Sequence, residues 1–228
     1  GVTGETAINE QGALATINTV NWRTTDALTL MVLHRYYDKR YTALHANSFS
    51  EGSGVQNEHG VYLGAKWQPV RAWLFQGYVD YAHFSWARYL VSLPSDAFDA
   101  LFSTGYNGKA WNMEARYRMR IRQRDNSDTK LLENRPEHRL RLRSNVSLSP
   151  QWSLQTQVDA VRNWADNDWQ QGLMLSQHAT WRWRWLTTDA HIGWFRSDSY
   201  DARLYQYERS VQYDFSFPAH YGHGLRHS

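Results

Sequence analysis

WNMEARYRMRIRQR (111–124) decides the fold class, because its side chains alternate between two chemical kinds. The apolar register consists of Trp111, Met113, Ala115, Tyr117, Met119 and Ile121. The polar and mostly cationic register consists of Asn112, Glu114, Arg116, Arg118, Arg120 and Arg122. Because side chains two residues apart share one face of a β-strand, the stretch predicts a long strand with an apolar face and an arginine face.

The composition limits what such a strand can belong to. The 228 residues suit one all-β domain, and they include 12 Trp and 14 Tyr, more aromatic side chains than a hydrophilic globular core needs. No run of about 18 apolar residues occurs, which excludes a transmembrane helix, whereas strands that cross a membrane need only alternate apolar residues. The absence of Cys excludes disulfides and thiolate metal sites. The net charge of +3 does not favour a dedicated nucleic-acid binder.

The period of two repeats along most of the chain and predicts about 11 or 12 antiparallel strands. We expect the strands at 12–22, 27–37, 61–67, 73–81, 98–106, 111–121, 138–148, 152–164, 173–185, 188–194 and 205–217.

The connections between these segments alternate in length. The short ones are 23–26, 69–70, 107–109, 149–151 and 186–187. The long ones are 37–60, 85–97, 124–137, the polar ADNDWQQ (165–171) and RSDSYDAR (196–203). In an up-and-down meander every second connection lies at the same end, so one end has short turns and the other has long loops. This pattern is typical of outer-membrane barrels.

A transmembrane barrel also explains both faces. Three tryptophans in one register, Trp181, Trp183 and Trp185, would form a large exposed apolar patch in water, whereas against lipid they form an interfacial girdle. The residues expected in this girdle are Trp111, Tyr117, Trp181, Trp183 and Trp185. The charged residues expected to face the lumen are Glu114, Arg116, Arg118, Arg120, Arg122, Arg139, Arg141, Arg143, Asp159, Arg182 and Arg184. We expect carboxylates to offset the repulsion between these arginines and a conducting lumen to prefer anions.

Several other interpretations fit parts of the pattern. A soluble two-sheet sandwich explains the arginines but leaves the alternating loop lengths as a coincidence. A nucleic-acid groove is disfavoured because the aromatic side chains lie on the face opposite the arginines. A filled barrel remains open, in which Arg side chains pair with Glu114, Asp159, Glu208 and Asp214.

The sequence offers no defined catalytic or metal site, and we expect no enzymatic activity and no cofactor. Histidines are numerous, but no ligand-spaced set with carboxylates is evident among His178, His191, His220, His223 and His227. Ser and His are both present, yet no motif fixes the geometry of a hydrolase.

Three segments carry a family resemblance: FSEGSGVQNEHGVYLGAKWQPVRAW (49–73), DYAHFSWARYLVSLPSDAFDALF (80–102) and YERSVQYDFSFPAHYGHGLR (207–226). The chain, from about residue 40 to 226, resembles the barrel region of Bacteroidota outer-membrane proteins that carry a helix-hairpin-helix segment. The resemblance implies an outer-membrane location and, through the DNA-binding role of such segments elsewhere, a link to DNA handling. The chain itself contains no helix-hairpin-helix segment, so no DNA-binding residue is implied.

Together these features predict an antiparallel up-and-down transmembrane β-barrel in the bacterial outer membrane, porin-like or a membrane scaffold. Its partners would be outer-membrane lipid, small anionic solutes and, by family analogy alone, nucleic acid. Residues 1–228 would form one domain that is incomplete at both ends, a piece of a barrel of about 14 or more strands, because an open sheet is prohibitive in lipid. The alternative is a soluble, secreted β-protein that binds glycans or other ligands through exposed aromatic side chains.

Overall fold

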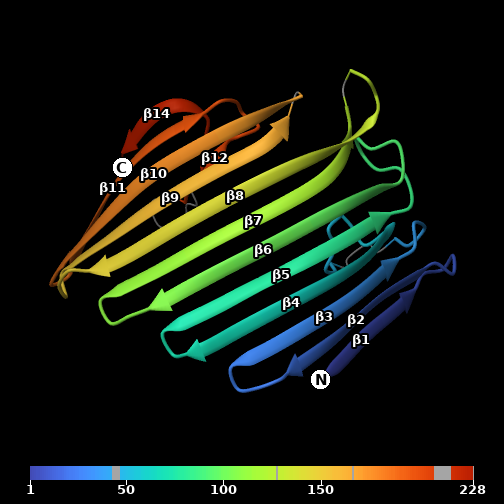
Figure 1. Ribbon diagram of the computed structural model, residues 1–228, viewed down its shortest axis with the longest axis horizontal. Coiled ribbons are helices and arrows are strands. Elements are labelled where there is room, and N and C mark those ends of the chain that lie inside the picture. Colours follow the sequence, from blue (N-terminus) through green and yellow to red (C-terminus); the bar gives the residue numbers. More distant parts are fainter. Residues whose placement is uncertain (43–46, 127, 166, 208–216, 228) are drawn as a thin grey trace. The chain divides into compact units, whose positions relative to one another are not determined.

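The computed structural model describes residues 1–42, 47–126, 128–165, 167–207 and 217–227. In these residues twelve strands form one sheet in which neighbours in the chain are neighbours in the sheet, except that β14 lies beside β11 (Figure 1). The first six strands are β1 (Val2–Ile8), β2 (Leu14–Arg23), β3 (Leu28–Tyr37), β4 (Glu58–Val70), β5 (Trp73–Phe84) and β6 (Ser95–Asn107). The other six are β7 (Trp111–Asp125), β8 (Leu132–Ser147), β9 (Trp152–Ala165), β10 (Asp168–Trp183), β11 (Leu186–Ser197) and β14 (Gly222–His227).

The prediction of an all-β, antiparallel, up-and-down sheet is confirmed by this strand order. In the described part of the chain, no helix is long and apolar enough to cross a membrane. β1 and β14 are the two end members of the strand order. The larger, closed barrel and the single incomplete domain stay predictions.

The chain divides into two compact units, which are described separately below. Unit 1 comprises residues 1–70, 74–102 and 119–136, and unit 2 comprises residues 71–73, 103–118 and 137–228. Strands β1 to β4 therefore belong to unit 1, and β9 to β11 and β14 belong to unit 2.

In unit 1, cross-strand register places a glycine opposite a fully buried arginine. Arg35 of β3 pairs with Gly60 of β4 across the ladder, and its side chain is completely buried. A Cβ added to Gly60 would lie 2.5 Å from the Arg35 guanidinium carbon. Because Gly60 has no Cβ, it leaves space for the Arg35 side chain to cross β4.

In unit 2, the connection that follows β11 packs on an apolar pad within the sheet. Ala202 and Leu204 are buried against Val161 of β9 and Met174 of β10. Leu204 belongs to the short strand β12 (Leu204–Tyr205), which pairs with β13 (Ala219–His220) in a separate two-stranded sheet. We call residues 198–207 the strap.

The expected spanning strand at 205–217 is wrong for the part that the structure describes. Leu204 and Tyr205 pair with Ala219 and His220 instead of with β11, and residues 208–216 lie outside the described residues. The strand that pairs with β11 is β14. Alternation alone could not distinguish these outcomes, because it identifies extended backbone but not the partner of each strand.

Two expected long loops are shorter than the sequence indicated. β9 ends at Ala165 and β10 begins at Asp168, so the polar ADNDWQQ segment is mostly strand. Likewise β8 begins at Leu132, which removes residues 132–137 from the expected loop. Where a strand extends beyond its apolar section, both of its faces carry polar side chains. The sequence pattern there is the same as that of a loop.

The register that packs Arg35 beside Gly60 makes that glycine a sensitive position. In Gly60→Ala the added methyl group should displace the buried guanidinium from its carboxylate partners. We expect the free energy of unfolding to fall by roughly 3 kcal/mol, the scale for breaking a buried ion pair. Urea unfolding in detergent micelles measures this. Gly54→Ala is the matched control, because a Cβ there meets no atom within 4 Å. Equal stability of the two variants would contradict the packing argument.

Candidate functional site

Ion pairs link alternate residues of neighbouring strands into a charged face of the sheet in each unit. In unit 1 this charged face contains Arg35, Glu58, Asp80, Asp99, Arg120 and Arg122. In unit 2 it contains Glu114, Arg139, Arg141, Arg143 and Asp159, with Arg182 in the corresponding register of β10. The opposite registers are largely apolar and are treated below.

Arg35 is the centre of the charged face in unit 1. Its Nε donates to Glu58, while its two terminal nitrogens donate to the two oxygens of Asp80 at 2.7 and 3.1 Å. Glu58 and Asp80 are themselves buried. One guanidinium therefore holds β3, β4 and β5 together through charge-assisted hydrogen bonds.

The connection between β3 and β4 folds onto this cluster. The hydroxyl of Tyr37 donates to the carbonyl oxygen of Phe49 at 2.8 Å. The amides of Glu51 and Gly52 donate to the carboxylate of Glu58 at 2.9 and 2.8 Å. We call residues 48–52 the inward segment. Its backbone satisfies a buried carboxylate, which fixes its position against the strands.

The inward segment is also held by arginines from β7. Arg122 donates to Glu51 at 2.6 Å, and Arg120 lies 3.6 Å from the same carboxylate. Arg120 also lies 3.4 Å from Asp99 of β6. In these ion pairs four carboxylates and three guanidiniums meet, so this part of the charged face offsets its own arginines.

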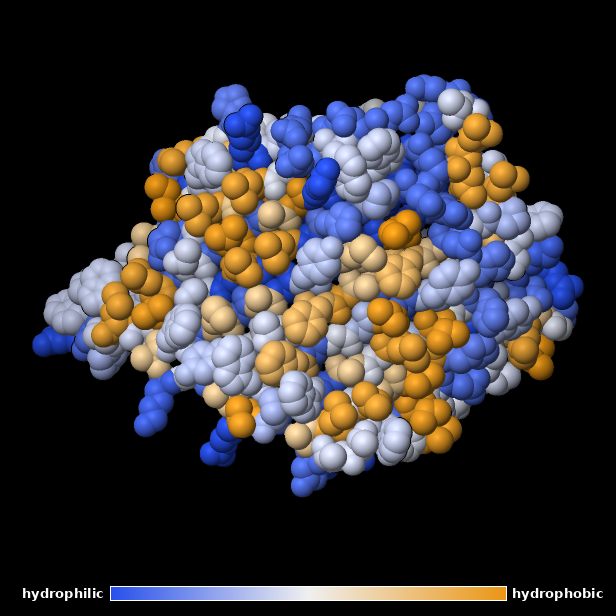
Figure 2. All heavy atoms as spheres, viewed as in Figure 1, coloured by the Kyte–Doolittle hydropathy of each residue, from blue (hydrophilic) through white to orange (hydrophobic). Residues whose placement is uncertain are grey.

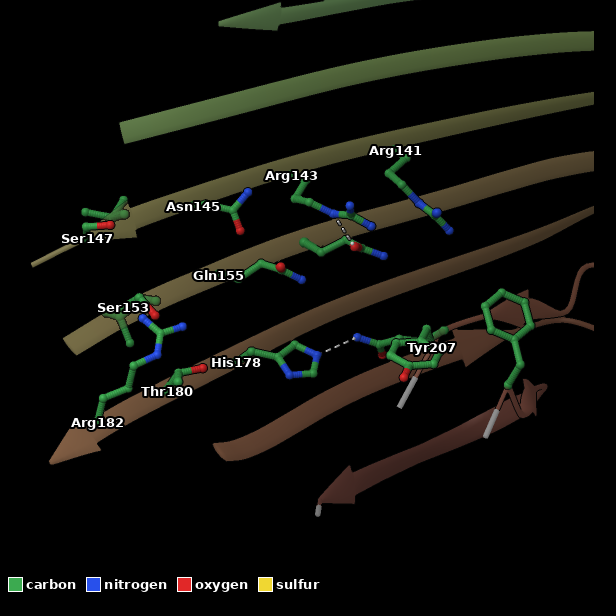
Figure 3. A pocket seen from close by; sticks show the side chains of 15 residues that line it. Arg141, Arg143, Asn145, Ser147, Ser153, Gln155, His178, Thr180, Arg182 and Tyr207 are labelled. Atoms are coloured by element: carbon green, nitrogen blue, oxygen red, sulfur yellow. Dashed lines mark hydrogen bonds between the residues drawn. The ribbon is translucent and has the colours of Figure 1, made fainter. Parts of the chain in front are cut away.

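In unit 2 the charged face lines a cavity of about 350 Å³ between the strands and the strap (Figure 3). Arg141, Arg143, Asn145 and Ser147 come from β8, and Ser153, Gln155 and Gln157 come from β9. His178, Thr180 and Arg182 project from β10, and Tyr207 approaches from the strap (Figure 3). The strap also contributes Gln206 to the lining. Phe217, Val146 and Leu154 complete the described lining. The described lining is therefore rich in hydrogen-bond donors.

The three arginines of this cavity differ in how their charge is balanced. Arg141 donates to Asp159 at 2.6 Å, a close ion pair. Arg143 donates to the neutral Gln157 at 3.0 Å and approaches Glu114 only to 4.0 Å. The guanidinium of Arg182 has no ion-pair partner among the described residues. No carboxylate belongs to the part of the lining that the structure describes.

The strap closes one side of the cavity through polar contacts. Gln206 donates to the hydroxyl of Ser176 at 2.7 Å, and both side chains are buried. Asn163 donates to the carbonyl oxygen of Asp201 at 3.2 Å. Together with the apolar pad, these contacts fix the strap against β9 and β10.

The opposite face is apolar and open. Large apolar side chains there keep between about two fifths and a half of their surface exposed: Leu63, Trp67, Val79, Leu142, Leu173, Leu175 and Trp194. Figure 2 shows apolar side chains spread across the face of the molecule that it displays. This apolar face is the alternate register of the strands that carry the charged face.

The predicted girdle residues lie at or near this apolar face. Trp111, Tyr117 and Trp183 are 45%, 44% and 49% exposed, and Trp181 stacks on Trp152 and on Trp183. Trp185 is 86% exposed because it lies in the two-residue turn between β10 and β11.

Arg184 lies in that turn too, with a left-handed φ of +52°, and not on a strand face as expected. Its guanidinium stacks over the ring of Trp183, 5.1 Å from the ring centre. The period-two pattern therefore extended the strand two residues too far.

Several predicted lumen residues are brought together and others are placed apart. Arg141 and Asp159 pair directly, and Glu114 approaches Arg143, whereas Arg139 pairs with Glu137 on its own strand. Arg116 and Arg118 share the register of Glu114 on β7. Glu208 and Asp214 lie outside the described residues.

The sequence analysis missed the buried cluster around Arg35. Glu58 and Asp80 are 23 and 45 residues from Arg35 along the chain, so no local motif joins them. A usable signal existed, since Arg35 and Asp80 are single charges at the ends of expected strands. The inward segment carried no such signal.

Histidines do not form a multi-ligand centre in the described residues. No group of three or more His, Cys, Asp or Glu side chains there converges on a metal position. His178 and His191 stack with their ring centres 4.2 Å apart, in line with their expected position on adjacent strands. His220 packs on Phe195 in unit 2.

Comparison with known proteins supports the fold. No protein-family model matches the sequence, and no curated protein matches it significantly. Among solved structures, the outer membrane channel DcaP of Acinetobacter baumannii superposes with a TM-score of 0.54 at 8% sequence identity. The match covers 82% of this chain but only 57% of the channel, so the chain spans little more than half of that protein's length. The resemblance to Bacteroidota proteins stays a prediction.

The pKa of Glu51 in the inward segment leads to a pH-dependent prediction. Burial raises this pKa above its ordinary value of 4.5, and Arg122 only partly opposes the shift. The folded state therefore holds the proton more tightly than the unfolded state, so this contribution to stability falls as pH rises through the folded pKa. In Glu51→Gln the free energy of unfolding should depend less on pH between about pH 4.5 and neutrality.

Urea unfolding of both proteins over a pH series measures the difference. Glu10→Gln, at an exposed position, is the control and should follow the unmodified protein. A difference between the unmodified protein and Glu51→Gln that stays constant over this pH range would show that Glu51 is not the titrating group.

Proposed function

We propose that the chain forms the wall of a porin-like β-barrel in the bacterial outer membrane, and that this barrel passes small anionic solutes. The observation that carries the proposal is the division of each long strand into an exposed apolar register and a charged register. The superposition on an outer membrane channel supports it at the level of the fold.

The membrane location follows from the chemistry of the apolar face. Side chains such as Leu173, Leu175 and Trp194 are about half exposed and lie on neighbouring strands. A contiguous apolar surface of this kind is unfavourable in water and favourable against lipid. Trp183 and Trp185 lie at the turn that joins β10 to β11, where an aromatic girdle would meet the headgroups.

The preference for anions follows from the different charge balance of the two units. In unit 1 the arginines of the charged face meet carboxylates. In unit 2, Arg143 reaches the carboxylate of Glu114 only at 4.0 Å, and Arg182 forms no ion pair among the described residues. A fixed positive charge without a close counter-charge raises the local concentration of mobile anions. A filled barrel with the same charged face would have no open path for solutes and would not conduct.

β1 and β14 are the end members of the strand order, so each has a neighbour on one side only in that order. A sheet edge in lipid leaves backbone amide and carbonyl groups without hydrogen-bond partners, at a cost of several kcal/mol each. We therefore propose that further strands, or a second chain, pair with β1 and β14.

Selectivity is tested in planar bilayers with the full-length protein. Under a salt gradient the reversal potential should indicate preference for the anion. Arg143→Gln and Arg182→Gln together should lower the anion-to-cation permeability ratio by about twofold or more, because two positive charges leave the lumen. Arg23→Gln, an exposed residue at the end of β2, is the control and should leave the ratio unchanged. Cation preference in the unmodified protein would overturn the proposal.

Sidedness is tested by two substitutions at adjacent positions of β7. Tyr117 is on the apolar face and Arg118 is on the charged face. An arginine at position 117 should cost on the order of 2–4 kcal/mol near mid-membrane, whereas Arg118→Gln should cost much less. Reversible unfolding in lipid vesicles gives both values. If the two costs are equal, Tyr117 does not face lipid.

A further inference from the structure

Two histidines on the apolar face bring their ring nitrogens together. Nε2 of His34 lies 3.0 Å from Nε2 of His59, and the two rings cross at 79°. His34 belongs to β3 and His59 to β4, where the register pairs Tyr36 with His59, so the two histidines are diagonal neighbours. His59 is exposed and His34 is half-exposed, and both lie near the ends of β3 and β4 that the long connection joins, where this face would emerge from the lipid.

The close approach means that the two nitrogens share one proton. One imidazole donates through Nε2–H and the other accepts at Nε2, because two donors or two acceptors would repel at this distance. If the donor ring carries its proton on Nδ1 instead, both Nε2 lone pairs are free and converge on the space between the rings. This is the arrangement of two neutral imidazole ligands around one metal ion.

We propose that His34 and His59 form a two-histidine binding site for a divalent transition-metal ion, with Cu²⁺ the preferred ion. The ion displaces the shared proton, lies to the side of the line that joins the two nitrogens, and links β3 to β4 near the ends of both strands. Solvent water completes its coordination on the exposed side.

The nitrogen separation is compatible with two adjacent ligands of one metal ion, and the order of metal affinities for nitrogen ligands favours Cu²⁺. Bonds of about 2.1 Å to two nitrogens 3.0 Å apart subtend an angle of about 90° at the metal. A tetrahedral Zn²⁺ site would need the nitrogens about 3.4 Å apart. Adjacent ligands at 90° match the tetragonal geometry of Cu²⁺ or Ni²⁺, and Cu²⁺ binds nitrogen ligands more strongly than Ni²⁺.

Three other histidine contacts have a different arrangement. His178 and His191 stack at an interplanar angle of 27°, so their in-plane lone pairs run side by side and do not converge. On the apolar face, His83 is engaged by Asp96 at 2.9 Å and His138 by the hydroxyl of Tyr117 at 2.8 Å. The pair His34–His59 therefore differs in geometry from the remaining candidates.

The test is titration of the tag-free, full-length protein in detergent with Cu²⁺, followed by calorimetry and electron paramagnetic resonance. We expect one tight equivalent whose spectrum shows two equivalent nitrogen ligands. His34→Gln and His59→Gln should each weaken this site by at least about tenfold, since the second ligand then no longer binds intramolecularly. Cu²⁺ should also raise the melting temperature of the unmodified protein but not of these variants.

The control is His178→Gln, which removes one histidine of the stacked pair and should leave the tight equivalent unchanged. Circular dichroism confirms that each variant retains its strands before titration. Loss of the tight equivalent in the control, its persistence in both His34→Gln and His59→Gln, or its absence from the unmodified protein would each overturn the proposal. None of these outcomes depends on whether the barrel conducts anions.

Discussion

The hydrogen-bonded ladder between antiparallel neighbours determines which side chains of this protein can meet. Once Arg35 is opposite Gly60, and Arg141 opposite Asp159, the charges of neighbouring strands lie on one face and the apolar side chains on the other. A slip of one residue in either pair would exchange the two faces. The buried ion pairs in turn hold the register, because any other alignment would leave a buried guanidinium without its carboxylate.

The sequence predicted the sheet well because its main signal is local. Alternation in 111–121 reports directly on two faces, and tight turns such as Arg184–Trp185 interrupt it only briefly. The same signal misled at 205–217, where alternating aromatic residues indicated a spanning strand. Leu204 and Tyr205 instead pair with a short strand next to the strap. Which extended segments pair is a non-local property, and period-two alternation carries no information about it.

The buried cluster of unit 1 was hidden for the same reason. Arg35, Glu58 and Asp80 come from three strands, and Glu51 comes from a connection that the sequence indicated only as a long loop. The inward segment is held by amides that donate to Glu58 and by Arg122, contacts that exist only once β3, β4 and β7 are in place. A loop that supplies buried acceptors is therefore part of the folded core and not a surface insertion.

The charge balance of the face has a consequence for any solute that passes it. Where Glu51, Glu58 and Asp80 meet Arg35 and Arg122, the protein supplies its own counter-ions, and a mobile anion would have to displace a carboxylate that is already bound. Displacement would leave that carboxylate buried without a partner, which costs several kcal/mol. Under the proposed function, the expected solute contacts therefore lie at Arg143 of β8 and Arg182 of β10, while Arg141 of β8 keeps its own ion pair with Asp159.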